Sequence, residues 1–200
     1  MTDEDFAALG LKAPARRISP PGGPIDVATV IERAAALCPD DEALDDTVRQ
    51  YTFAQLAEAV AAAAVLFEQQ GIKTGDRVAA SLGNEANLVI AFFAAMQLGA
   101  IWVGINKILP VHDKRYILEH SGTRLLITDT ALQGEIEGIR AQLPALTAVW
   151  YLDSAGTDGG WAAAMANPPS PAPRRPRIDP FAPAVIMYTS GTTGVPKGVV

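Results

Sequence analysis

The sequence predicts an α/β fold, in which a largely parallel sheet is flanked by helices. Candidate strands and helices alternate between residues 26 and 166 and are joined by short turns, the pattern of strand–helix–strand units. The candidate strands are continuous apolar runs, as strands covered by helices on both faces require. Because the 200 residues are 49% hydrophobic and 19% charged, the chain can bury a sizeable core.

The N-terminal 25 residues predict a loosely held arm, because they end in a segment rich in proline and glycine. Asp26 then fits the N-cap of a helix that runs to about Cys38 and is ended by Pro39. Since Cys38 is the only cysteine, no internal disulfide can form, and we expect a buried and inert thiol.

A short hairpin is predicted next, in which residues 42–44 pair with residues 49–52. Five acidic residues lie in or beside this hairpin: Asp40, Asp41, Glu42, Asp45 and Asp46. Acidic clusters are candidate metal sites, but no rigid element fixes the geometry of these carboxylates. We therefore favour a solvated turn.

The remaining elements follow from caps, turns and apolar runs. Thr52 and Gln55 predict a capping box at the start of a long helix, which Gly71 closes. Asn84 is the expected N-cap of an uncharged helix that runs to about Leu98. The other expected elements are strands at 77–82, 100–105, 124–128 and 147–152 and helices at 113–120 and 131–143.

One uncharged stretch, from Ala86 to Asn106, has about the length of a membrane-spanning helix. However, Asn87 and Gln97 interrupt it, and Gly99 stands where a helix should stop. The residues after Gly99 are typical of a strand. We therefore predict a buried helix followed by a buried strand, and no transmembrane segment.

Residues 167–183 contain seven prolines, so they cannot form a helix or a central strand. A PxxP spacing is also typical of ligands of partner modules, but we favour a plain extended connector into an apolar strand at 184–188. The predicted organisation is an arm at 1–25, an α/β part at 26–166, the connector at 167–183, and a strand with a loop at 184–200.

The loop after this strand is built from hydroxyl side chains, glycines and one lysine. Residues 188–198 are Tyr-Thr-Ser-Gly-Thr-Thr-Gly-Val-Pro-Lys-Gly. Hydroxyl groups, and backbone N–H groups that glycine leaves accessible, are donors suited to phosphate. Ordinary turns share this composition, but the length of the run and its isolated Lys197 favour a phosphate-binding loop. It is not a P-loop of the common kind, because Gly198 follows the lysine in place of Ser or Thr.

This loop resembles the phosphate-binding signature of the acyl-adenylate-forming enzymes, which include acyl-CoA synthetases, adenylation domains of peptide synthetases and luciferases. The resemblance covers about residues 26–200, with further matches in order at 51–56, 75–78, 91–100, 106–110 and 116–122. Gly83 and Gly104 depart from the family, which often has proline there. Asn106 and the Gly-Thr-Thr-Gly form of the loop favour an acyl-CoA synthetase over an amino-acid-activating domain.

The resemblance implies ATP-dependent activation of a fatty or aromatic carboxylic acid to acyl-AMP and then to acyl-CoA, with ATP, Mg²⁺ and CoA taking part. It implies that the β- and γ-phosphates are held by Thr189, Ser190, Gly191, Thr192, Thr193, Gly194 and Lys197, and that Lys197 is the catalytic cation. It assigns no metal ligand in this chain. His112 and His120 lie in no motif, so we expect both to be surface or structural residues.

Family members continue far beyond residue 200, so we expect an N-terminal piece that is inactive alone. Its unpaired sheet edge predicts poor solubility or self-association. One alternative is a truncated, non-catalytic module that binds phosphate or a partner. The other is an unrelated phosphate-binding domain.

The charge and the N-terminus exclude some classes of protein. A net charge of −6 argues against a nucleic-acid surface, which needs basic patches. The acidic start, from Asp3 to Asp5, lacks the basic and then apolar layout of a signal peptide. Together with the single cysteine, these features predict a cytoplasmic protein.

Overall fold

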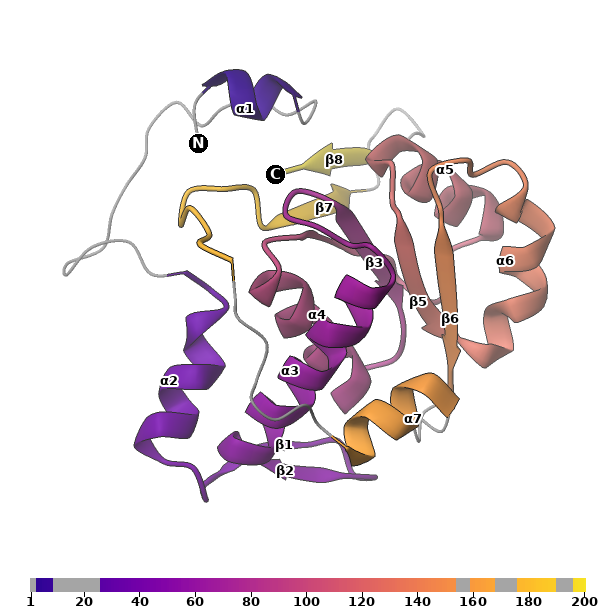
Figure 1. Cartoon of the computed structure of the whole chain (residues 1–200). Coiled ribbons are helices and arrows are strands. Elements are labelled where there is room, and N and C mark those ends of the chain that lie inside the picture. The colour runs from indigo at the N-terminus through magenta and orange to yellow at the C-terminus, as the bar shows by residue number, and fades with distance from the viewer. Residues whose placement is uncertain (1–2, 9–25, 154–158, 168–175, 190–195) are drawn as a thin grey trace.

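A largely parallel sheet forms the middle layer of the molecule (Figure 1). The computed structural model describes residues 3–8, 26–153, 159–167, 176–189 and 196–200. Within these residues the sheet has six strands in the order β6-β5-β3-β4-β7-β8. Every neighbouring pair is parallel except β7 and β8, which are antiparallel. The strands are β3 (Arg77–Ser81), β4 (Ile101–Gly104), β5 (Leu125–Asp129), β6 (Ala148–Leu152), β7 (Val185–Thr189) and β8 (Lys197–Val199).

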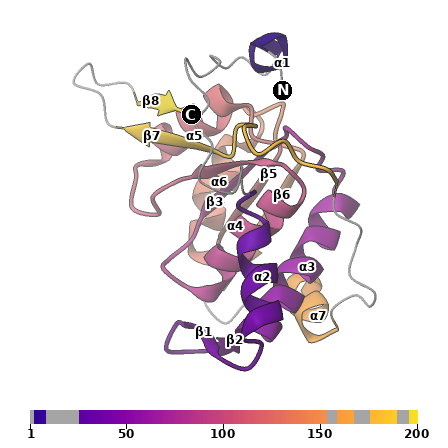
Figure 2. The ribbon, with the colours of Figure 1, turned by 90° about the vertical axis from the view of Figure 1, so that its left-hand side faces the viewer.

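Helices cover both faces of this sheet, so the expected α/β class is confirmed (Figures 1 and 2). One face carries α2 (Thr29–Leu37), α3 (Phe53–Gln69), α4 (Ala86–Gln97) and α7 (Gly159–Ala166), and the other carries α5 (Val111–Ser121) and α6 (Gln133–Arg140). A short antiparallel hairpin of β1 (Glu42–Asp45) and β2 (Gln50–Thr52) packs against α3. Helix α1 (Asp3–Ala8) lies near the N-terminus.

The central strands divide their side chains between two apolar cores. In β3, Val78 and Ala80 join the core under α3 and α4, whereas Ala79 joins the core under α5 and α6. In β5, Leu125 and Ile127 likewise face the first core and Leu126 the second. Because successive side chains of a strand point to opposite faces, a strand buried on both faces must be apolar at every position, as the sequence is.

Several caps occur as predicted. The Thr52 and Gln55 capping box is present at the start of α3. Gly71 follows that helix with φ +79° and donates its N–H to the Glu68 carbonyl. Gly122 ends α5 in the left-handed conformation with φ +61°. At positive φ, glycine causes less backbone strain than any other residue because it has no Cβ.

Two expected N-caps are wrong. Helix α2 begins at Thr29 with Ala28 at its N-cap, and Asp26 accepts a hydrogen bond from the Ala28 N–H before the helix begins. Helix α4 begins at Ala86, and its N-cap position is Glu85 in place of Asn84. The Ala86 N–H donates instead to Asp46 Oδ2, at 2.8 Å, from the β1–β2 turn. A partner 40 residues away in the sequence supplies this cap.

The solvated-turn prediction is therefore wrong for Asp46, whose side chain is 3% exposed, although the other four acidic residues of the cluster are exposed. Cys38 is half-buried, not buried, and its thiol donates to the Ala34 carbonyl. In place of one helix at 131–143, the chain forms a 3-10 turn (Thr130–Leu132) followed by α6.

The uncharged stretch forms a buried helix and a buried strand, as expected, in α4 and β4. Among the described residues, no helix is both long enough and apolar enough to cross a membrane. Helix α7 was not expected, and its Trp161 is fully buried in the first core. The division into arm, α/β part, connector and loop segment stays a prediction, because much of the arm and connector lies outside the described residues.

Candidate functional site

The two strands that flank the predicted phosphate-binding loop form an antiparallel hairpin stem. Thr189 is the last residue of β7 and Lys197 the first of β8, and the two face each other in the ladder. Both residues are exposed. The structure thus brings these two predicted site residues together. The other five, Ser190, Gly191, Thr192, Thr193 and Gly194, lie outside the described residues.

The stem emerges at the carboxyl edge of the parallel sheet. Strand β7 runs parallel to β4, with Val185 opposite Trp102 and Ile186 opposite Val103. The buried Ile186 anchors the strand in the second core, and β7 then leaves the core toward Thr189. Ligands of open α/β sheets bind outside the carboxyl ends of the strands, so the stem holds its polar groups where a ligand is expected.

A cavity of about 940 Å³ opens beside the stem, and Thr189 and Pro196 form part of its wall. An apolar part of its lining comes from α4 and β4: Leu88, Val89, Phe92, Phe93 and Trp102. The rings of Phe92 and Trp102 meet edge to face, with their centroids 5.6 Å apart. The cavity is therefore lined by polar residues of the stem and by aromatic side chains of α4 and β4.

The charges around this cavity differ in their partners. Among the described residues no acidic side chain forms an ion pair with Lys197. Lys107, which also lines the cavity, pairs with Asp129, and this hydrogen bond lowers the pKa of the Asp129 carboxyl. Within the described residues Lys197 thus has no acidic partner, whereas Lys107 is paired with Asp129.

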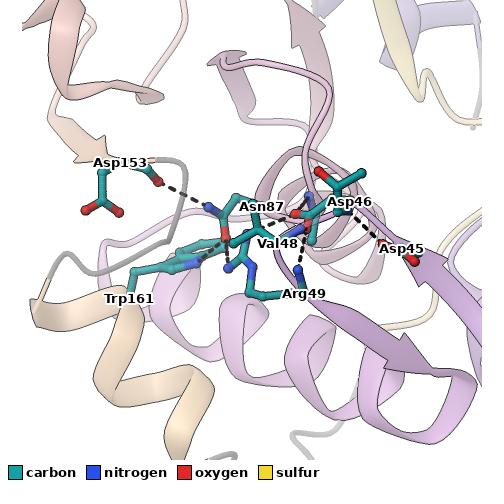
Figure 3. Close-up of polar contacts among 9 residues, drawn as sticks. Asp45, Asp46, Val48, Arg49, Asn87, Asp153 and Trp161 are labelled. Atoms are coloured by element: carbon teal, nitrogen blue, oxygen red, sulfur yellow. Dashed lines mark hydrogen bonds and ion pairs between the residues drawn. The ribbon is translucent and has the colours of Figure 1, made fainter.

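The far end of the same edge carries a polar network instead of an open site (Figure 3). Asn87 Oδ1 accepts hydrogen bonds from Arg49 Nη1 and Trp161 Nε1, each at 3.0 Å, and Asn87 Nδ2 lies 3.5 Å from the Asp153 carbonyl. Burial raises the pKa of Asp46, but hydrogen bonds from the N–H groups of Ala86, Arg49 and Val48 outweigh it and lower that pKa to about 2.

This network binds the β1–β2 hairpin, α4 and α7 to one another, so the Asn87 amide and the Asp46 carboxyl are bound within the protein. Within the described part of the chain, no group of three or more His, Cys, Asp or Glu side chains could hold a metal ion. In this hairpin, Asp46 accepts a hydrogen bond from the first N–H of α4.

A comparison with protein families matches residues 31–200 to the family described as "AMP-binding enzyme". The chain belongs to this family. The match spans both the sheet and the hairpin stem, as the resemblance at residues 26–200 predicted, and it excludes an unrelated phosphate-binding domain.

Individual relatives agree with membership of the AMP-binding family. The chain is 35% identical to a malpibaldin synthetase of Mortierella alpina over 175 residues, which are 86% of this chain and 3% of that protein. It is 34% identical to a 2-succinylbenzoate–CoA ligase of Geobacillus kaustophilus over 169 residues, covering 84% of this chain and 31% of that one.

A solved structure extends the likeness to the fold. The crystal structure of the anthranilate CoA ligase AuaEII in complex with anthranoyl-AMP superimposes with a TM-score of 0.80 at 27% identity, over 88% of this chain and 34% of that chain. This AMP-binding chain therefore spans about a third or less of the length of these relatives.

The two histidines of the AMP-binding chain lie in different surroundings. His112 is exposed, and its Nε2 lies 3.5 Å from Asp113 Oδ1. His120 contacts the stem: its Nδ1 lies 2.8 Å from the Tyr188 hydroxyl, and its ring stacks on Tyr116. No motif surrounds His120 in the sequence, and only the packing of α5 against the stem brings it to Tyr188.

Proposed function

We propose that this chain carries the phosphate-binding part of an enzyme that activates a carboxylic acid with ATP. In the first step, the acid's carboxylate attacks the α-phosphate, which gives acyl-AMP and releases pyrophosphate. In the second step, the CoA thiol displaces AMP and forms a thioester. The observation that carries this proposal is the pairing of Thr189 with Lys197 across the stem, at the carboxyl edge of a sheet of the AMP-binding family.

The stem suits the charge that develops in the first step. Negative charge accumulates on the departing pyrophosphate, and donors fixed in advance stabilise it without reorganising during the reaction. We propose that Thr189 and Lys197 bind the β- and γ-phosphates together with Ser190, Gly191, Thr192, Thr193 and Gly194. The proposed reaction uses ATP as its Mg²⁺ complex, so we expect the ion to reach the stem bound to ATP.

We propose further that the acid is fatty or aromatic. The apolar wall of the cavity beside Thr189 supports this choice, because aromatic and aliphatic side chains favour an uncharged acyl group. The names of two relatives, the anthranilate and the 2-succinylbenzoate CoA ligases, support an aromatic acid and CoA as the acceptor. The relatives also include a malpibaldin synthetase, whose name does not mention CoA. The proposal that CoA is the thiol acceptor therefore needs its own test.

The binding test uses the whole 200-residue chain and calorimetric titration with MgATP or with inorganic pyrophosphate. We expect Lys197→Ala to weaken binding about tenfold to a hundredfold, because hydrogen bonds to charged groups contribute about 1.5–3 kcal/mol. Lys73→Ala is the matched control, since Lys73 is an exposed lysine in the turn before β3. Equal affinities of the Lys197→Ala and wild-type chains would contradict the proposal.

A second assay separates an enzyme from a binding module. Pyrophosphate release is measured with ATP, CoA and either a medium-chain fatty acid or benzoate. Release that depends on the acid and disappears in Lys197→Ala supports catalysis by the chain itself. Tight binding of pyrophosphate without any release supports a phosphate-binding module that needs further protein for turnover.

A further inference from the structure

Helix α5 contacts the hairpin stem at Tyr188, which lies against His120, Tyr116 and Ser121 of the helix. His120, in the last turn of α5, lies with its Nδ1 2.8 Å from the hydroxyl of Tyr188, the residue that precedes Thr189 in β7. The His120 ring also stacks on Tyr116 from the same helix, at an interplanar angle of 24°. The histidine is thereby oriented on its own helix before it meets the stem.

Tyr188 in turn packs on the opposite strand of the stem. It pairs with Gly198 in β8, and a Cβ placed on Gly198 would come within 3.2 Å of the tyrosine ring. The ring therefore lies directly on the β8 backbone, one residue from Lys197. A shift of this ring would change how β7 and β8 are spaced where they carry Thr189 and Lys197.

Apart from Ile186 and Tyr188, which pack against the second core, little of the stem is covered by the described part of the chain. Met187 and Val199 face each other across it and are 58% and 57% exposed, and Thr189 and Lys197 are exposed as well. A two-stranded hairpin is marginally stable by itself in water. Its geometry near the loop therefore depends on β4 on one side and on the His120–Tyr188 contact.

We propose that His120 is a positioning residue for the phosphate-binding site. By holding the Tyr188 hydroxyl, it fixes the ring against β8 and keeps Thr189 and Lys197 at the spacing that binds phosphate. This role rests on the proposed function of the stem. His120 itself touches no phosphate in this scheme and acts through Tyr188.

The chemistry of the pair suits a fixed contact at neutral pH. Burial, together with the nearby Tyr116, raises the pKa of Tyr188 to about 12, so its hydroxyl stays protonated. The hydroxyl can donate to Nδ1 of a neutral imidazole whose proton is on Nε2. Asparagine places a polar atom close to the position of Nδ1, whereas phenylalanine keeps the ring stack and deletes the hydrogen bond.

The experiment compares His120→Phe, Tyr188→Phe, their double variant and His120→Asn, with titration of inorganic pyrophosphate and MgATP. We expect each Phe variant to bind about threefold to tenfold more weakly, the range that one lost hydrogen bond accounts for. Both variants delete the His120–Tyr188 contact, and Tyr188→Phe also removes the interaction of the hydroxyl with Ser121. We therefore expect the double variant to bind no more weakly than Tyr188→Phe alone. His120→Asn should bind within about twofold of the wild type.

His112→Phe is the matched control, because it is the same substitution at the other end of α5, away from Tyr188. It should leave affinity unchanged. Urea unfolding of each variant checks that a lost affinity is not lost folding. The substitutions of the exposed His112 and His120 should change the free energy of unfolding by less than about 0.5 kcal/mol. Wild-type affinity in His120→Phe, or multiplying losses in the double variant, would overturn the proposal.

Hydrogen exchange distinguishes this proposal from the proposed function. The N–H groups of residues 187–189 and 197–199 should exchange at least about threefold faster in His120→Phe than in His112→Phe, whether or not a phosphate binds. If the wild type binds neither probe but the stem exchanges faster in His120→Phe, the proposed function fails and the positioning of the stem stands. Unchanged exchange in His120→Phe overturns the positioning role in either case.

Discussion

The two ends of the sheet's carboxyl edge use polar side chains in opposite ways. Near β3 and β6, Asn87 is fully buried and its amide is bound by Arg49 and Trp161. Near β7 and β8, Thr189 and Lys197 are exposed, and within the described residues Lys197 forms no ion pair. Both ends contain the residue types that bind ligands, but only the second leaves them open to solvent.

This difference separates a structural network from a candidate binding site. Buried polar groups must be satisfied by the protein, since each unmade hydrogen bond costs about 1–3 kcal/mol. Such groups hold elements together and have little capacity left for a ligand. Exposed donors on the stem cost little in stability, because water satisfies them. Substitutions in the buried network should therefore change the free energy of unfolding, whereas substitutions on the stem should change the affinity for phosphate.

The largest effect on stability is expected for Asn87→Ala. The change removes the acceptor of Trp161 Nε1 and Arg49 Nη1 and leaves a small cavity, so we expect the free energy of unfolding to fall by about 3 kcal/mol. Urea unfolding followed by circular dichroism measures it. Asn167→Ala, at an exposed asparagine, is the control, and a loss below about 1 kcal/mol in Asn87→Ala would contradict the role of the network.

Asp46→Asn should lower the free energy of unfolding by about 1–2 kcal/mol at pH 7. This value is reduced because the residues around the buried carboxyl, Asp45, Thr47 and Val48, are exposed to water. The folded-state pKa of Asp46 is about 2 and its ordinary value is 3.8. A lowered pKa stabilises the fold above the ordinary value, and this contribution disappears as the pH falls from about 5 toward 2. The free energies of unfolding of the variant and the wild type, measured at several pH values, should therefore converge in acid. A difference that stays constant with pH would show that the charge of Asp46 does not stabilise the fold.

Trp161→Phe should cost about 1–2 kcal/mol, because it removes a buried hydrogen bond and leaves part of the space of a fully buried indole empty. The variant keeps an aromatic ring near Trp150 but deletes the Nε1 donor to Asn87, which removes one buried hydrogen bond. In the background of Asn87→Ala the same change should cost less, because its partner is already absent. Additive losses in this double-mutant cycle would show that the two residues act independently.

The smallest effect is expected at the open end, for Met187→Ser. Met187 is 58% exposed, so its replacement should change the free energy of unfolding by no more than about 0.5 kcal/mol. Lys197→Ala should be equally mild in unfolding while weakening phosphate binding. A loss above about 1.5 kcal/mol in either variant would mean that the stem is part of the folded core, and the contrast between the two ends would fail.

Local signals predicted much of the fold correctly. The capping box of Thr52 and Gln55, the helix ends at Gly71 and Gly122 and the continuous apolar strands all depend on neighbours within a few residues. The caps of α4 and the burial of Asp46 were missed because their partner lies 40 residues away. Helix α7 was missed because it is short and lacks a helical pattern of apolar residues.

By itself, the sequence determined the α/β class, the order of most elements and the composition of the loop at 188–198, because periodicity, caps and hydroxyl–glycine runs are local properties. Tertiary structure alone decided which polar residues are exposed to a ligand and which are bound within the protein. It buried Asn87 and Asp46 in a network, opposed Thr189 to Lys197 across a stem, and brought His120 to Tyr188. The reason is physical: burial and contact between distant segments depend on how helices pack on the sheet, which no short stretch of sequence encodes.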